Sequence, residues 1–190
     1  SFKYTAIDGT ATSNEATANI TITETNDVPV AASVNGSGNE GGTVSVILSA
    51  TDEDSSDPST FTFTIVSAPS NILDDNSDGT ADAGDVTITS PLTYDASTKT
   101  YTATATYKHD GSELTTDSFT YKASDNKGDS NISTATIAIT PVNDPPELVE
   151  IGTRTTNEDL PDTLTLSVVD PDNDSHIFTA IPSDSSDIID

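Results

Sequence analysis

Apolar and polar residues alternate with a period of two along most of the chain. The alternating runs are short, rich in Val, Ile, Thr, Tyr and Phe, and bounded by clusters of Gly, Pro, Asn and Asp, which is the pattern of half-buried β-strands. No segment keeps the 3.6-residue apolar period of a helix over a useful length. The predicted strands are Val30–Val34, Thr43–Ala50, Thr60–Val66, Asp85–Thr89, Thr100–Tyr107, Asp117–Ala123 and Ser133–Thr140.

The last two predicted strands show which faces should enter a core. Phe119 and Tyr121 share one face of their strand, and Ala135, Ile137 and Ile139 share one face of the next. Seven short antiparallel strands at this spacing are typical of an immunoglobulin-like β-sandwich. We therefore expect an all-β protein with almost no helix.

The chain repeats itself at an offset of 117 residues. Residues 1–29 are similar to residues 118–146. A second echo, or internal match, links NEGGTVSVILSATDED from Asn39 to NEDLPDTLTLSVVDPD from Asn157, at an offset one residue larger. Repeats of this length are domain-sized. We expect a window of a tandem array, with one complete unit at 29–144, the last strands of a unit at 1–28 and the first strands of another at 145–190. The matched pairs are Phe2/Phe119, Tyr4/Tyr121, Asp8/Asp125, Asn14/Asn131, Ile20/Ile137, Asn26/Asn143 and Asp27/Asp144.

The charge of the chain is strongly negative. With 32 acidic and 6 basic residues, the formal net charge is −26. A polyanion of this kind is repelled by nucleic acid and by anionic membrane surfaces, and no apolar run is long enough to span a bilayer. The regular alternation argues against disorder. Two interpretations remain, namely the acidic surface of a salt-adapted protein and a set of ligands for a hard cation.

One acidic segment has the spacing of a calcium loop. DDNSDGTADAGD, from Asp74 to Asp85, places oxygen-bearing residues at alternate positions and Gly79 at the sixth, where a sharp turn is needed. It resembles the loops of dockerins and thrombospondin type 3 repeats, and a solvated acidic turn is the alternative interpretation. The predicted Ca²⁺ ligands are Asp74, Asn76, Asp78, Thr80, Asp82 and Asp85.

A second motif is spread along the chain as Y-x-A-x-D, an alternating strand, N-D-x-P, a Glu and D-x-D. This pattern, together with HDGSELTTDSFTYKASDNKG from His109, resembles the cadherin-like, Ig-like tandem repeats of large bacterial surface adhesins of the RTX and VCBS type. The resemblance covers essentially the whole chain. It implies a Greek-key sandwich and, by analogy with cadherins, calcium at the joint between successive domains.

The resemblance assigns ligands at two joints. At the first joint, Asn26 and Asp27 of the linker meet Asp52, Asp54 and Asp125. At the second joint, the linker and the next unit contribute four residues, and Glu40 approaches from the base of the central unit. The four are Asn143, Asp144, Asp170 and Asp172.

Two departures from the cadherin pattern leave the joint ligands and the number of ions per joint open, because the D-R-E segment is missing and the N-D-x-P linker is shorter and less acidic than that of cadherins. The D-R-E segment that cadherins carry at the base has no counterpart here, and Asp110, Glu113 and Asp117 are weak substitutes for it. The N-D-x-P linkers have a simpler interpretation as Asx turns ended by proline.

These features favour a structural function. We expect a calcium-rigidified stalk or filament segment of a long secreted protein on a bacterial surface, whose partners are neighbouring repeats and other copies in a filament. A cadherin-like module that binds carbohydrate or a surface protein is the alternative, and strand exchange between the incomplete ends is a third hypothesis. An enzyme is not indicated, because the chain has no Cys and no G-x-S-x-G, and its only histidines, His109 and His176, lie in acidic segments.

Overall fold

The structure is a computed structural model that describes residues 1–74, 76–157 and 163–179. Within these ranges the chain is almost entirely β, which confirms the predicted class, and its one helical element is the 3-10 turn η1 (Ala83–Asp85). None of the described segments forms a helix long and apolar enough to cross a membrane. The strands are β1 (Phe2–Tyr4), β2 (Ala16–Ala18), β3 (Val30–Ala31), β4 (Val34–Asn39), β5 (Thr43–Thr51), β6 (Thr62–Ser67), β7 (Thr87–Asp95), β8 (Thr100–Lys108), β9 (Thr116–Ser124), β10 (Ser133–Thr140), β11 (Glu147–Leu148) and β12 (Val168–Val169).

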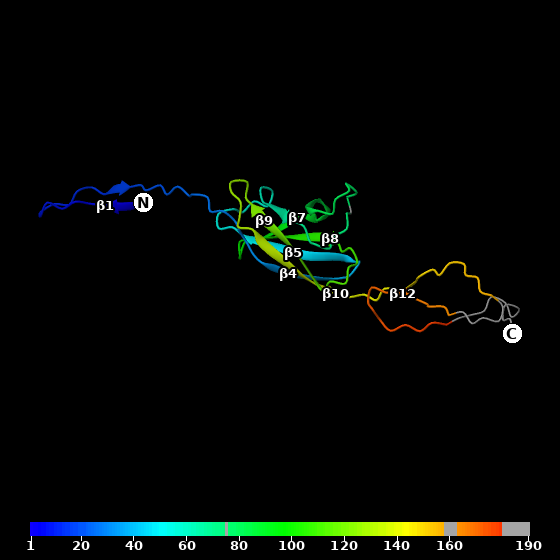
Figure 1. The fold of residues 1–190 in the computed structure, drawn as a ribbon. Coiled ribbons are helices and arrows are strands. Elements are labelled where there is room, and N and C mark those ends of the chain that lie inside the picture. The colour runs from blue at the N-terminus through cyan, green and yellow to red at the C-terminus, as the bar shows by residue number, and fades with distance from the viewer. Residues whose placement is uncertain (75, 158–162, 180–190) are drawn as a thin grey trace.

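Eight strands form one curled sheet between Val30 and Thr140. The order is β6-β9-β10-β4-β5-β8-β7, with β3 also paired to β5. Every pair is antiparallel except β10 with β4, which run parallel. Although β6 and β8 lie far apart in this order, Phe61 before β6 stacks on Tyr101 of β8 with ring centroids 3.8 Å apart. The sheet therefore curls around a single core, which lies between the two terminal segments of the chain (Figure 1).

Strict alternation builds the core. In β8, Tyr101, Ala103, Ala105 and Tyr107 point inward and are buried, while the threonines between them face outward. Phe119 and Tyr121 are 1% and 0% exposed, and the Ala-Ile-Ile face of β10 is buried as predicted. Burying each large apolar side chain contributes about 1.5–3 kcal/mol, so these facing rows are a main source of stability.

The first predicted strand of the central unit is wrong in its extent. The chain forms β3 over two residues and then β4 from Val34 to Asn39, a segment that reads VNGSGN. Its glycines lie directly against β5, since a Cβ added to Gly38 would lie 2.6 Å from Cγ2 of Val44. Side chains at these positions would push β4 off β5. Because glycine has a low strand propensity, the sequence of this segment does not predict a strand.

The strand predicted at Asp85–Thr89 begins later and is longer. Asp85 belongs to η1, where Asp82 caps the turn and its side chain accepts a hydrogen bond from the amide of Gly84. The strand β7 then starts at Thr87 and continues to Asp95. The acidic loop thus ends in a capped turn before the strand begins.

The short terminal strand pairs repeat the register of the central unit. Phe2 pairs with Ala18 as Phe119 pairs with Ala135, which preserves the offset of 117 residues. At the other end, Leu148 pairs with Val168 as Ala31 pairs with Ala50. The repeat in the sequence is therefore also a repeat in strand pairing. Residues 158–162 of the second echo, and residues 180–190, lie outside the described residues.

The aromatic side chains of β1 are in a different environment from their central counterparts. Phe2 and Tyr4 are 57% and 55% exposed, whereas Phe119 and Tyr121 are buried. Within the described residues, β1 and β2 pair only with each other, so no opposing strands cover this face. The central unit shows what covers the equivalent face, namely the inner sides of β5, β6 and β8.

Candidate metal centres

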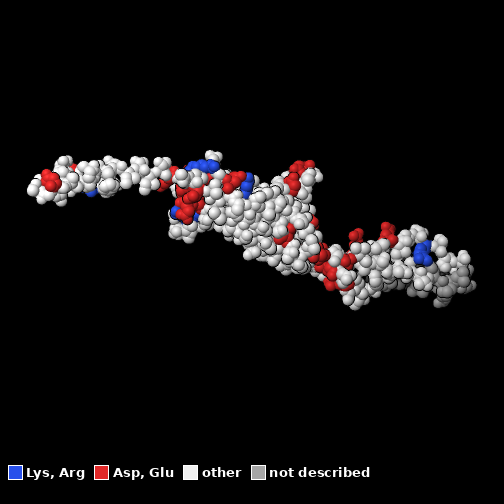
Figure 2. Space-filling view, turned by 60° about the vertical axis from the view of Figure 1, so that its left-hand side comes forward, with Lys and Arg blue, Asp and Glu red and all other residues white. Residues whose placement is uncertain are grey.

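The first candidate centre lies where β5 and β9 end, beside the N-terminal linker. Asp52 and Asp54 follow β5, and Asp125 follows β9. One carboxylate oxygen from each of the three lies within 4.8 Å of the others. Acidic side chains gather at this end of the central unit in the space-filling view (Figure 2). The structure thus brings together three residues that span 73 positions of the sequence, from 52 to 125.

Two of these carboxylates are buried, and in each only one of the two oxygens accepts hydrogen bonds. Asp52 and Asp125 are 2% and 3% exposed. Oδ1 of Asp52 accepts from the amides of Asp54 (3.1 Å) and Ser55 (2.9 Å). Oδ1 of Asp125 accepts from the amides of Lys127 (2.8 Å) and Gly128 (2.7 Å). In the described structure, the Oδ2 atom of each is buried without a hydrogen-bond partner.

The electrostatics of the two carboxyl groups differ. Burial raises the pKa of Asp52, with a further contribution from the neighbouring Asp54 carboxylate. Burial also acts to raise the pKa of Asp125, but its amide donors and the side chain of Asn26 outweigh this effect, so that its pKa is lowered. A buried, unpaired carboxylate oxygen is costly unless it is protonated or bound to a cation. The donor set, made of oxygens only, fits a hard divalent cation.

The N-terminal linker contacts this centre through its backbone. The amide of Asp27 donates to Oδ2 of Asp54 at 3.2 Å, and the side-chain amide of Asn26 donates to the carbonyl of Asp27 at 3.0 Å. Val28 packs against Gly128 so closely that a Cβ on the glycine would lie 2.5 Å from Cγ1 of the valine. The linker is therefore seated against the same loop that carries Asp125.

The second candidate centre lies at the opposite end of the unit. Glu40, Glu113 and Asp144 each place one carboxylate oxygen within 4.8 Å of the others. Glu40 is 7% exposed, and its Oε2 accepts from the amide of Val142 at 3.4 Å. Desolvation raises the pKa of Glu113, and the negative charges of Glu40 and Asp172 raise it further. The mutual repulsion of these carboxylates is the condition that a bound cation relieves.

The C-terminal linker meets the next segment through the same contact as the first linker. The amide of Asp144 donates to Oδ2 of Asp172 at 2.6 Å, just as that of Asp27 donates to Asp54. Oδ1 of Asp170 accepts from the amide of Asp172 at 3.0 Å, as Asp52 accepts from Asp54. The side-chain amide of Asn143 donates to the carbonyl of Asp144, as Asn26 does to Asp27. The two joints thus share one local geometry.

Three residues at or near the second joint were given little or no role by the sequence. Glu113 is a member of the carboxylate cluster although its sequence position made it a weak candidate. His176 contacts Asp170, with 2.5 Å between Nε2 and Oδ2. His109 is fully buried, although it lies in the segment that carries Asp110 and Glu113. A turn can bring Glu113 to Glu40, but nothing in the local sequence pattern signals it.

The acidic loop from Asp74 to Asp85 is closed by its own backbone amides. Oδ2 of Asp74 accepts from the amide of Gly79 at 2.8 Å, and Gly79 has a φ of +91°. The buried Asp85 accepts from the amides of Asn76 (3.0 Å) and Asp82 (2.9 Å). The first and last positions of the loop therefore fold over its middle.

The remaining loop oxygens also face the backbone. Asn76 accepts from the amide of Asp78, Asp78 from that of Thr80, and Asp82 from that of Gly84. Among the described residues, no three carboxylates of this loop converge within 4.8 Å as those of the two joints do. The calcium loop stays a prediction, and the joints have the stronger donor geometry.

Asp117, another weak candidate, has a structural role. It is buried, and its carboxylate accepts from the amides of Ser70 (3.0 Å), Asn71 (3.4 Å) and Ser118 (2.7 Å) and from the hydroxyl of Tyr107 (3.2 Å). Burial raises the pKa of Tyr107, and the Asp117 carboxylate raises it further. Asp117 thus attaches the base of the acidic loop to β9.

Replacing Asp117 by Asn should lower the free energy of unfolding by about 2 kcal/mol, because an amide nitrogen would face donors that now have an acceptor. Urea unfolding in calcium and in EDTA measures the loss, which should be the same in both. Asp129→Asn, which removes an exposed ion pair with Lys122, is the control and should change stability by less than about 1 kcal/mol. A loss seen only in calcium would mean that Asp117 acts through a metal.

Comparison with known proteins leaves the family open. No family model matches the chain. No curated protein matches it either.

Proposed function

We propose that this chain is a calcium-rigidified segment of a long, secreted repeat protein, serving as stalk or filament material on a bacterial surface. The proposal includes Ig-like, cadherin-like Greek-key sandwich units, with a complete unit at 29–144 between partial units. The observation that carries it is the pair of buried, unpartnered oxygens of Asp52 and Asp125 beside Asp54 at the linker.

Calcium is the cation that this donor set favours. Carboxylate, amide and carbonyl oxygens are the ligands of hard cations, and Ca²⁺ accepts six to eight of them in irregular geometry, whereas Mg²⁺ requires a near-ideal octahedron. The residues that would hold it at the first joint are Asn26, Asp27, Asp52, Asp54 and Asp125. Those at the second joint are Glu40, Glu113, Asn143, Asp144, Asp170 and Asp172. A bound cation neutralises the converging carboxylates.

The role of the chain's own residues is to fix the joint. The linker amide of Asp27 and the Asp54 carboxylate already connect the linker to the unit that follows it. The packing of Val28 on Gly128 restricts the same linker sterically. With the repulsion between carboxylates removed, these contacts would hold successive units in one orientation. The joints of a chain of net charge −26 would then be stiff despite the repulsion between its remaining charges.

The carbohydrate- or protein-binding alternative has less support. Sugar-binding platforms use exposed aromatic rings, and six of the ten Phe and Tyr side chains are buried in the core. These six are Phe61, Phe63, Tyr101, Tyr107, Phe119 and Tyr121. The structural function therefore explains more of the placement of side chains.

Calorimetric titration with Ca²⁺ tests the proposal directly. We expect saturable binding with a Kd of roughly 1 mM or tighter, the range of extracellular calcium modules. Asp125→Asn should remove the binding of the first joint, and Glu40→Gln that of the second. Heat that does not saturate, or titrations that are the same for the chain and both variants, would contradict calcium binding at the joints.

A further inference from the structure

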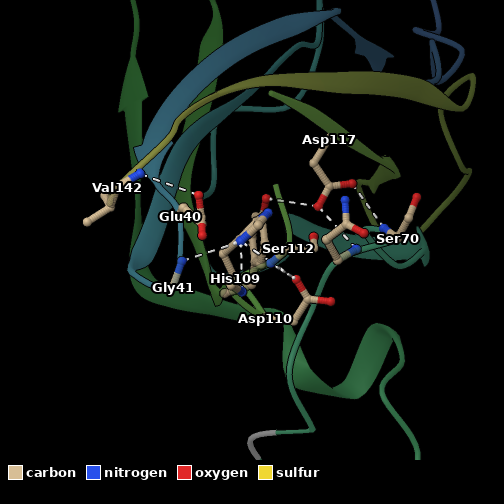
Figure 3. A network of polar contacts seen from close by, with 11 residues as sticks. Glu40, Gly41, Ser70, His109, Asp110, Ser112, Asp117 and Val142 are labelled. Carbon is tan, nitrogen blue, oxygen red and sulfur yellow. Dashed lines mark hydrogen bonds and ion pairs between the residues drawn. The ribbon is translucent and has the colours of Figure 1, made fainter. Parts of the chain in front are cut away.

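A buried histidine lies beneath the second joint. His109 follows β8 and is 0% exposed, and its backbone amide donates to the carbonyl of Gly42 at 3.0 Å. Its ring nitrogen Nδ1 accepts from the amide of Gly111 at 3.2 Å and lies 3.5 Å from the donating amide of Gly41. Figure 3 shows the imidazole between the turn that carries Glu40 and the segment that leads to Ser112.

Both amides belong to glycine turns that carry candidate ligands. The amide of Gly42 donates to the carbonyl of Asn39 at 3.1 Å, so Glu40 and Gly41 are the central residues of a tight turn between β4 and β5. Gly41 has a φ of +60° and Gly111 a φ of +87°. Glycine turns have a wide range of backbone conformations, and the hydrogen bonds made by their amides select one. Glu40 directly precedes Gly41, and Glu113 comes two residues after Gly111.

We propose that His109 is the positioning residue of the second joint, where its Nδ1 joins the two turns so that the carboxylates of Glu40 and Glu113 converge. This inference rests on the proposed calcium function and adds the residue that organises one of its sites. His109 does not itself contact the cation. It acts through Gly41 and Gly111.

The hydrogen-bond pattern fixes the form of the ring. Because Nδ1 accepts from backbone amides, the proton of the neutral ring is assigned to Nε2. Oδ1 of Asp110 lies 3.7 Å from Nδ1, which is too far for a hydrogen bond, and it accepts instead from the amide of Ser112 at 2.9 Å. The ring is therefore an acceptor for the two turns and not one half of an ion pair.

The other ring nitrogen argues against a role in packing alone. Nε2 of His109 and Oγ of Ser112 are both buried without a hydrogen-bond partner in the described part of the chain. A leucine would fill this space without burying an unpaired nitrogen, but it would leave the amides of Gly41 and Gly111 without an acceptor. What the imidazole supplies, and an apolar side chain cannot, is the acceptor at Nδ1.

Three variants of the full chain test this role. In His109→Asn the side-chain Oδ1 takes the place of Nδ1, since both atoms are bonded to Cγ. In His109→Gln the amide lies one bond further out, and His109→Leu has no acceptor. Calcium titrations followed by NMR report each joint separately, through the amides of Gly41 and Asp144 for the second joint and those of Asp54 and Ser55 for the first.

We expect His109→Leu to weaken calcium binding at the second joint by about tenfold or more, the usual effect of removing a group that orients a metal ligand. Binding at the first joint should stay unchanged in the same molecule, which also shows that the variant is folded. His109→Asn should restore most of the lost affinity, and His109→Gln should not.

Two results would overturn the inference. One is an equal affinity at the second joint in His109→Leu and the unchanged chain. The other, which remains available if the leucine variant does not fold, is a second joint in His109→Asn that is weakened as much as in His109→Gln. If the unchanged chain binds no calcium at either joint, the proposed function fails as well, so the two failures are distinguishable.

Discussion

Removing calcium with excess EDTA should lower the melting temperature of the chain by about 10 °C for each occupied site. A ligand that binds only the folded state adds about 2.7 kcal/mol when its concentration is a hundred times its Kd. Each kcal/mol shifts the melting temperature of a domain of this size by roughly 4 °C or more. The effect should be large because the three converging carboxylates of each joint, at least one of them buried, lose the charge that offsets their repulsion.

Chelation should also change the shape of the chain in solution. With calcium, small-angle scattering should show an extended particle whose profile fits one conformation. In EDTA, the linkers at 26–29 and 143–146 should act as hinges and the profile should require an ensemble. Magnesium at the same ionic strength is the control, and it should restore neither stability nor stiffness fully. Identical melting curves and scattering profiles with calcium and with EDTA would refute the calcium-rigidified rod.

Replacing Asp52 by Asn should stabilise the folded chain in EDTA and destabilise it in calcium. The pKa of Asp52 is raised above its ordinary value near 3.8, so the folded chain holds this proton more tightly than the unfolded chain does. Stability in EDTA is therefore lost as the pH rises from 3.8 through the raised pKa. The asparagine cannot ionise, and it keeps an oxygen to accept from the amides of Asp54 and Ser55. The variant should be more stable than the unchanged chain at pH 7 in EDTA.

In calcium the order should invert. The variant lacks one charged ligand of the first joint, so it forgoes the stabilisation of that site, about 2.7 kcal/mol at a hundredfold excess of calcium over Kd. Thermal unfolding of both proteins with and without calcium gives the four values required. Asp57→Asn is the matched control, because Asp57 is exposed and accepts from Ser59 outside the cluster. A variant that is less stable in both conditions would show that Asp52 has a structural role only.

The sequence predicts those strands whose own residues alternate between buried and exposed positions. The strands β5, β8, β9 and β10 follow from alternation, since each has one buried and one exposed face. The strand β4 does not, because Gly36 and Gly38 are required by the close approach of Val44 and Val46, which are on another strand. The start of β7 is shifted by a capped turn whose hydrogen bonds no periodicity encodes.

The candidate sites divide in the same way. The members of the first joint could be named because the resemblance to cadherin-like repeats implied them, and three of them, Asn26, Asp27 and Asp125, also recur at one offset. The sequence offers Glu113 only as a weak substitute and gives no role to His109, because both act where turns meet only after β4, β5 and β8 have paired. In the acidic loop the sequence predicts a calcium site from the spacing of its side chains. The carboxylates at these positions accept hydrogen bonds from the loop's own amides instead of converging on one point.

The parallel pairing of β10 with β4 determines how the unit would bear mechanical load. Because its first long strand and its last strand run in the same direction, the chain enters at one end and leaves at the other. Tension along the chain pulls these strands past each other. The six residue pairs from Val34–Ala135 to Asn39–Thr140 then resist together in shear, instead of opening one after another as in a peeled hairpin. A stalk made of such units would transmit force through this one ladder.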